Sequence, residues 1–147
     1  GDQFVTQAVF VLDGMPYEEQ ERILGQILAT RRVAACYIDR FGIGHELTER
    51  MTNLWPGIVE GIAFTNPLKA EIAYRVKVAM ESGNWFMPAD SDLRDDFASI
   101  ERDITDSGLM KLAAPRTSGG HGDRFWAAAL AAHAAVSHKP FRLIMAM

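Results

Sequence analysis

Cysteine is almost absent from this chain of 147 residues, since Cys36 is the single one. One cysteine cannot form an internal disulfide, and with four scattered histidines it gives no zinc-finger spacing. Long apolar runs are absent too, because none approaches the ~18–20 residues that a membrane span needs. Residues 1–3 carry no basic region typical of a signal peptide, so we expect neither secretion nor membrane insertion.

Positive charge is not in excess: 15 Lys and Arg stand against 19 Asp and Glu, a formal net charge of −4. This balance excludes a strongly basic nucleic-acid binder of the histone or zinc-finger type. It does not exclude an enzyme that touches DNA locally, because metal-binding carboxylates make such a protein acidic. With 48% apolar residues and no repeat or linker, we expect one domain over residues 1–147.

Hydrophobic periodicity predicts alternating strands and helices. The expected strands cover residues 4–12, 33–38, 58–64, 85–87 and 109–113, and the expected helices cover residues 17–30, 47–55, 67–81, 93–104 and 122–137. Asn66 is expected to be the N-cap before Pro67, and Ser91 the N-cap of the helix over residues 93–104. This alternation indicates an α/β sheet with helices packed on it.

Asp39 stands where an apolar strand gives way to a glycine loop. Ligands of open α/β sheets gather at the carboxyl ends of strands, so a carboxylate there is well placed to bind a metal ion. The alternative is a turn residue whose side chain accepts hydrogen bonds from nearby amides. The pair Gly42 and Gly44 suggests a third interpretation, a phosphate-binding loop, although Leu47 stands where the full dinucleotide pattern needs a small residue.

Asp123 lies in the first turn of the last expected helix, where the helix dipole favours an acid whatever its function. The Ala-rich helix and the glycines before it favour a site, because they permit close packing on a sheet. Asp39 and Asp123 could share divalent ions such as Mg²⁺, which prefer oxygen ligands. We therefore expect these two carboxylates to converge in space.

Other polar side chains are weaker candidates. His121 is a possible metal ligand or proton shuttle, or else an exposed loop residue. Arg116, Lys69 and Arg124 are candidate contacts to DNA phosphates, although isolated basic residues usually belong to the solvated surface. Cys36, inside an apolar strand, is interpreted as a packing residue, and His133, on the apolar stripe of its helix, as a core or interface residue.

Four segments, taken in order and at their spacing, resemble one protein family. They are IDRFGIG at residues 38–44, EGIAFTNPLK at residues 60–69, APRT at residues 114–117 and HGDRFWA at residues 121–127. Together they resemble the nuclease domain of the large terminase subunit of tailed phages, in particular the Mu-like prophage type. The resemblance covers residues 2–133.

This resemblance implies an α/β, RNase H-like fold, with a mixed sheet flanked by helices and an acidic cluster that binds two Mg²⁺ or Mn²⁺ ions. Asp39 matches the family's acid at the end of the fourth strand, and Asp123 matches its acid on the last helix. The resemblance also implies cutting of concatemeric double-stranded phage DNA in the host bacterial cytoplasm, with the portal protein and the small terminase subunit as partners. ATP would serve only a motor domain placed upstream in that family.

One departure from the family pattern concerns its first acid, which lies on a first, central strand. By this comparison the chain begins at the third strand, so we expect an N-terminally truncated domain that is weakly active or inactive by itself. Uncovered strand edges would then favour a homo-oligomer. Two alternatives stay open: a non-catalytic domain that docks DNA or packaging partners, and a small nucleotide-binding α/β domain that uses Gly42 and Gly44.

Overall fold

The computed structural model describes residues 3–41, 44–104, 110–113 and 122–138. Its contacts divide the chain into a first unit, Gly1–Val11 with Phe64–His133, and a second unit, Leu12–Ala63 with Ala134–Met147. The single domain expected over residues 1–147 stays a prediction. None of the helices in the described part of the chain is long and apolar enough to cross a membrane.

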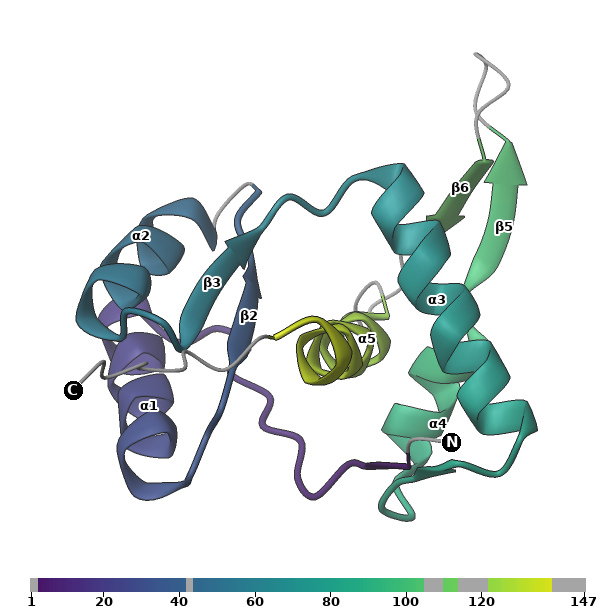
Figure 1. Ribbon diagram of the computed structural model, residues 1–147, viewed down its shortest axis with the longest axis horizontal. Helices are drawn as coiled ribbons and strands as arrows, with labels where there is room; N and C mark the ends of the chain where they lie inside the picture. The colour runs from purple at the N-terminus through teal and green to yellow at the C-terminus, as the bar shows by residue number, and fades with distance from the viewer. Residues whose placement is uncertain (1–2, 42–43, 105–109, 114–121, 139–147) are drawn as a thin grey trace, which may run out of the picture. The chain divides into compact units, whose positions relative to one another are not determined.

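The second unit is built on two parallel strands with two helices. Its elements are α1 (Tyr17–Thr30), β2 (Cys36–Asp39), α2 (Gly44–Leu54) and β3 (Val59–Ile62). In the parallel register Ile38 faces Gly61 and Asp39 faces Ile62. The helices α1 and α2 lie side by side next to the strand pair (Figure 1).

One apolar cluster holds these four elements together. Leu28 from α1, Met51 from α2 and Val59 from β3 form its buried centre. Met51 is wholly buried, and Leu24, Ile38 and other half-buried apolar side chains pack around this centre. The periodicity of residues 17–30 predicted α1 correctly, because its apolar side chains recur on the face that this cluster covers.

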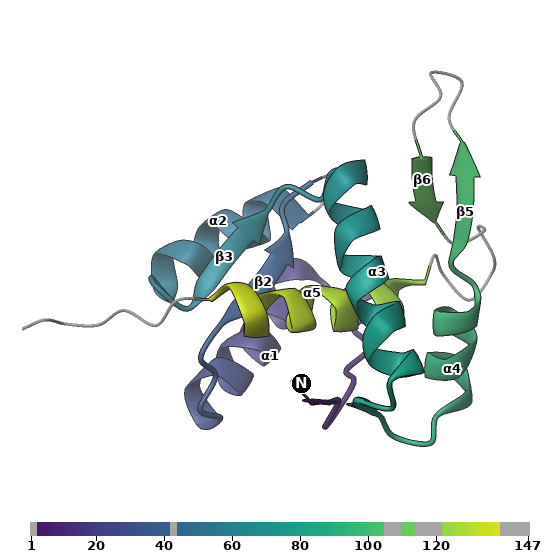
Figure 2. The same cartoon turned by 45° about the vertical axis from the view of Figure 1, so that its right-hand side comes forward.

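The first unit has more and shorter elements. They are β1 (Phe4–Val5), α3 (Asn66–Glu81), β4 (Trp85–Phe86), α4 (Ser91–Ala98), β5 (Glu101–Ile104), β6 (Met110–Ala113) and the start of α5 (Asp123–Ser137). β1 pairs with β4 in parallel, and β5 pairs with β6 in antiparallel orientation. Figure 2 shows this antiparallel pair following α4, with α3 beside β6.

A row of aromatic side chains packs the first unit. It runs from Phe4 through Trp85, Phe97, Phe125 and Trp126 to Phe64, with successive ring centroids 4.9 to 6.1 Å apart. Most of these pairs meet edge to face, the arrangement that the ring quadrupoles favour. The row therefore joins β1, β4, α4 and α5 with Phe64, which lies two residues before α3.

The α/β class is confirmed, and parallel and antiparallel pairs both occur. The described strands hydrogen-bond two by two. The strand expected over residues 4–12 is wrong beyond Val5, because β4 offers only two residues for pairing. The helix expected over residues 93–104 ends at Ala98, because residues 101–104 pair with β6 instead.

Two helix caps lie one residue before the expected position. Thr65, not Asn66, caps α3, because the Thr65 hydroxyl accepts a hydrogen bond from the Leu68 amide at 3.4 Å. Asp90, not Ser91, caps α4, because its carboxylate accepts from the Leu93 amide at 3.0 Å. Each expected residue instead becomes the first residue of its helix.

Candidate functional site

Asp39 is the last residue of β2, at the carboxyl end of a parallel strand. Its side chain is half-buried, and the Phe41 amide donates a hydrogen bond to Asp39 Oδ1 at 3.0 Å. The Asp39 side chain therefore stabilises the turn after β2, which is the alternative to metal binding that the sequence left open. Among the described residues, Asp39 Oδ2 has no hydrogen bond, so the same carboxylate still offers an oxygen to a ligand.

The end of β2 is held by the neighbouring strand and by α2. The Arg40 amide donates to the Ile62 carbonyl at 3.1 Å, which continues the pairing just past Asp39. On β3, Gly61 allows α2 to approach closely: a Cβ at this position would lie 2.5 Å from Thr48 Cγ2. The glycine in the segment EGIAF therefore fixes the packing that supports the position of Asp39.

Asp123 is the first residue of α5, and its side chain is exposed. It follows Gly122, whose φ of 73° places it in the left-handed region that favours glycine. The helix starts at this point, because the Trp126 amide donates to the Gly122 carbonyl at 3.1 Å. Within the described part of the chain, the Asp123 carboxylate has no hydrogen bond or ion pair.

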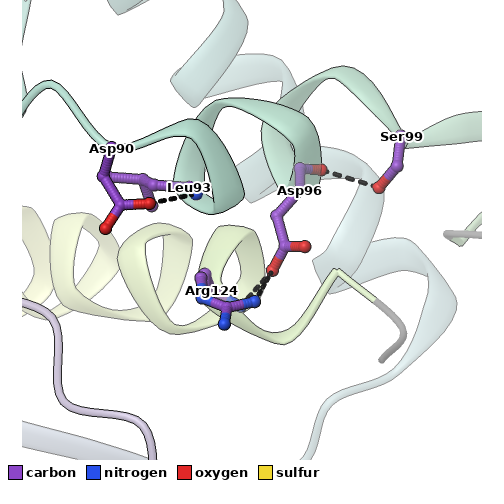
Figure 3. A network of polar contacts seen from close by, with 5 residues as sticks. All are labelled: Asp90, Leu93, Asp96, Ser99 and Arg124. Atoms are coloured by element: carbon purple, nitrogen blue, oxygen red, sulfur yellow. Dashed lines mark hydrogen bonds and ion pairs between the residues drawn. The ribbon is translucent and has the colours of Figure 1, made fainter. Parts of the chain in front are cut away.

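Asp96, which sequence reasoning missed, provides the acceptor at the start of α5. The Arg124 amide donates to Asp96 Oδ2 at 2.9 Å, and the Arg124 guanidinium lies 3.5 Å from the same oxygen (Figure 3). The sequence contains only an indirect signal for such an acceptor. Gly122, just before the helix, has no side chain that could cap it, so another residue has to accept the hydrogen bond. Nothing in the sequence says which of the many acids takes that role.

The basic candidates differ in their surroundings. Arg124 is engaged by Asp96, with 22% of its side chain exposed, so an internal contact accounts for it. Lys69 Nζ lies 4.9 Å from the centroid of the Phe64 ring and 5.2 Å from that of the Trp126 ring, a cation–π arrangement. Trp126 is one helical turn after Asp123, so Lys69 is held near the first turns of α5. DNA contact by Lys69 and Arg124 stays a prediction.

Two candidate residues lie outside the described part of the chain. These are His121, the possible metal ligand or proton shuttle, and Arg116, a candidate phosphate contact. Residues 42 and 43 of the glycine loop lie outside it too, and Gly44 is the first residue of α2.

Cys36 and His133 lie in packed surroundings, as predicted. Cys36 packs against the apolar cluster of the second unit, and burial raises the pKa of its thiol. His133 is half-buried on α5, and its Nδ1 accepts a hydrogen bond from Arg75 Nη1 at 3.2 Å.

A hollow of about 340 Å³ opens on the second unit, beside β2, β3 and the end of α5. Tyr37, Glu60 and His138 are among its lining residues. Burial, and secondarily the Glu60 carboxylate, raises the pKa of the Tyr37 phenol. The hollow includes neither of the two predicted metal-binding acids.

The two acids differ in setting but share their chemistry. Asp39 belongs to the second unit and Asp123 to the first, and their convergence stays a prediction. Among the described residues, no three His, Cys, Asp or Glu side chains form a group that could hold a metal ion. Both acids offer carboxylate oxygens without a full set of hydrogen bonds, and such hard donors fit Mg²⁺ or Mn²⁺.

The described residues thus form α/β elements in which one acid ends the parallel strand β2 and another opens α5. The family model described as "Terminase RNaseH-like domain" matches residues 1–135, so the chain belongs to the terminase RNase H-like domain family. No curated protein sequence matches the chain.

Solved structures of two phage proteins have the same fold. The magnesium-bound large terminase nuclease of thermophilic phage G20c aligns with a TM-score of 0.67 and 22% identity, over 80% of this chain. The cobalt-bound form of the same nuclease gives 0.66 and 22%, again over 80% of this chain. The large terminase nuclease domain of Thermus phage P74-26 gives 0.65 and 18%, over 88% of this chain. The chain spans 61%, 62% and 66%, respectively, of the length of these relatives.

Proposed function

We propose that this chain is the metal-dependent endonuclease domain of a phage terminase large subunit, and that it cuts double-stranded DNA. The observation that carries the proposal is Asp39, a half-buried carboxylate at the carboxyl end of β2 in a chain of this family. The magnesium and cobalt in two related nuclease structures support the choice of a divalent ion. The oxygen donors of this chain favour Mg²⁺ or Mn²⁺.

In this proposal Asp39 and Asp123 hold the ions, with His121 as a possible further ligand. When bound, such ions activate a water molecule and stabilise the leaving oxygen of a phosphodiester. Asp39 is well suited to its role, because the Phe41 amide fixes one of its oxygens and orients the other. Lys69 supplies a positive charge to a DNA phosphate near α5, and Phe64 and Trp126 hold its ammonium group in place.

The parent protein acts in the cytoplasm of a host bacterium, where it cuts concatemeric phage DNA as packaging proceeds. The portal protein and the small terminase subunit are its proposed partners, and ATP serves a motor domain in the same polypeptide. Two carboxylates provide few fixed ligands, so we expect the present chain to bind Mn²⁺ weakly and to nick DNA poorly or not at all.

A plasmid-nicking assay tests the proposal. Supercoiled DNA is incubated with the chain in Mg²⁺, in Mn²⁺ and in EDTA, beside Asp39→Asn and Asp123→Asn. Any nicking by the parent chain should require the metal ion and fall by at least ~100-fold in each variant, since even residues that only support a metal ligand often contribute 10–100-fold. Mn²⁺ affinity, measured by electron paramagnetic resonance, provides a second readout.

The matched controls remove the same charge elsewhere. Asp13→Asn changes an exposed acid of the second unit, and Asp95→Asn changes an exposed acid on α4. Both should nick at the parent rate, and circular dichroism should show every variant folded. Nicking that survives EDTA would contradict the metal requirement. A folded Asp39→Asn or Asp123→Asn chain that retains both nicking and Mn²⁺ affinity would remove that residue from the site.

A further inference from the structure

The first turn of α5 begins without a cap of its own. A helix N-cap side chain normally accepts a hydrogen bond from the amide two or three residues later. Gly122 has no side chain for this purpose, and Asp123 is exposed, with no hydrogen bond to its carboxylate among the described residues. The amides of this turn therefore need an acceptor from another part of the chain.

Asp96 on α4 is that acceptor. Its Oδ2 accepts from the Arg124 amide at 2.9 Å and lies 3.5 Å from the Arg124 guanidinium (Figure 3). Only 14% of the Asp96 side chain is exposed, so water screens these contacts little. A carboxylate at a helix N-terminus is also stabilised by the helix dipole, and hydrogen bonds to a charged acceptor are stronger than neutral ones.

Asp96 is itself held in place. The Ser99 hydroxyl donates to the Asp96 carbonyl at 2.8 Å, and the Asp90 carboxylate caps the other end of α4 (Figure 3). Next to Asp96, the Phe97 ring packs edge to face on the Phe125 ring, with centroids 5.0 Å apart. The two helices are therefore fixed to each other by both polar and aromatic contacts.

The amide that Asp96 binds belongs to the peptide bond between Asp123 and Arg124. This bond is planar, so fixing its N–H also fixes the plane that carries the Asp123 carbonyl and Cα. We propose that Asp96 is a positioning residue, which fixes the backbone from which the Asp123 carboxylate reaches a metal ion. This inference rests on the proposed function, because the position of this backbone matters for metal binding only if Asp123 is a metal ligand.

Mn²⁺ affinity of the full chain tests this role. Affinity is measured by electron paramagnetic resonance at a temperature where circular dichroism shows each variant to be folded. We expect Asp96→Asn to weaken Mn²⁺ binding by roughly tenfold and Asp96→Ala by more, because residues that orient a metal ligand contribute 10–100-fold. The asparagine variant keeps a neutral acceptor for the Arg124 amide, so it also serves if the alanine variant does not fold.

Asp95→Asn is the matched control, because it removes the same charge from the neighbouring, exposed position of α4. Its Mn²⁺ affinity should equal that of the parent. A purely structural role would lower the thermal midpoint of the Asp96 variants and leave Mn²⁺ affinity of the folded chain unchanged, which would overturn the inference.

Mn²⁺ binding by Asp123→Asn distinguishes a failure of the positioning role of Asp96 from a failure of the proposed metal-ligand role of Asp123. If Asp123→Asn weakens Mn²⁺ binding and a folded Asp96→Asn does not, only the positioning role is wrong. If Asp123→Asn binds Mn²⁺ as the parent does, the metal-ligand assignment fails and the positioning role fails with it. Weaker binding in both, with Asp95→Asn unchanged, supports the inference.

Discussion

Replacing Gly61 by alanine tests the packing that supports the end of β2. The added Cβ would lie 2.5 Å from Thr48 Cγ2 and 3.3 Å from Arg40 Cβ. Two carbons pack best at about 3.5–4.0 Å, so the first contact overlaps by roughly 1 Å. Thr48 is 6% exposed and Met51 beside it is wholly buried, so the helix has little room to move away.

Overpacking of this kind costs about 1–3 kcal/mol. Gly61 does not have a positive φ, so the backbone itself accepts alanine. Alanine even gains about 0.4–1 kcal/mol by restricting the unfolded chain, which offsets part of the steric cost. We therefore expect Gly61→Ala to lower the free energy of unfolding by about 1–2 kcal/mol, or the Tm by roughly 2–8 °C.

Thr48→Ser identifies the cause, because it removes Cγ2 and keeps the hydroxyl. Urea denaturation of the parent, both single variants and the double variant gives the coupling between the two positions. In the Thr48→Ser background, Gly61→Ala should cost at least about 1 kcal/mol less than in the parent. Equal costs in both backgrounds, or a Gly61→Ala chain as stable as the parent, would refute this account of the packing.

Two further predictions concern a cap and a titrating group. Thr65→Ala should destabilise the chain by about 1 kcal/mol in urea denaturation, and Asn66→Ala by less, because Thr65 accepts the hydrogen bond of the Leu68 amide. A larger loss of stability in Asn66→Ala than in Thr65→Ala would show that Asn66 is the cap. Burial and then Glu60 raise the pKa of Tyr37, so the folded chain holds that proton more tightly than the unfolded chain. This stabilisation is present below the unfolded pKa of about 10 and is lost as pH rises through the folded value. Tyr37→Phe should flatten the fall in stability above about pH 10, and an unchanged slope would contradict the assignment.

Patterns within short stretches of sequence correctly predicted the elements that depend mainly on neighbouring residues. The apolar stripe over residues 17–30 predicted α1, and the run ending in Ile38 and Asp39 predicted a strand with an acid at its end. Caps were harder, because Thr65 and Asn66 are adjacent residues that can both accept the hydrogen bond. In the folded chain the Thr65 hydroxyl accepts the hydrogen bond from the Leu68 amide, so Thr65 is the cap.

Long-range pairing was not visible in the sequence. Residues 101–104 continue the helical apolar spacing of α4, yet they form the strand β5, because they pair with β6. The same limit applies to Asp96, which is 28 positions before Arg124 and resembles any other acid on a helix surface. The fold places it beside the start of α5.

The aromatic row of the first unit has a spectroscopic consequence. Of the three tryptophans, Trp85 and Trp126 belong to this row, whereas Trp55 packs on the apolar cluster of the second unit. Each unit thus carries its own intrinsic fluorophore in a distinct environment. In a Trp55→Phe chain, tryptophan emission and near-ultraviolet circular dichroism of the intact row report the first unit, whereas emission of a chain that keeps Trp55 alone reports the second. Unfolding of the two units can thus be followed separately in two matched variants, without any added label.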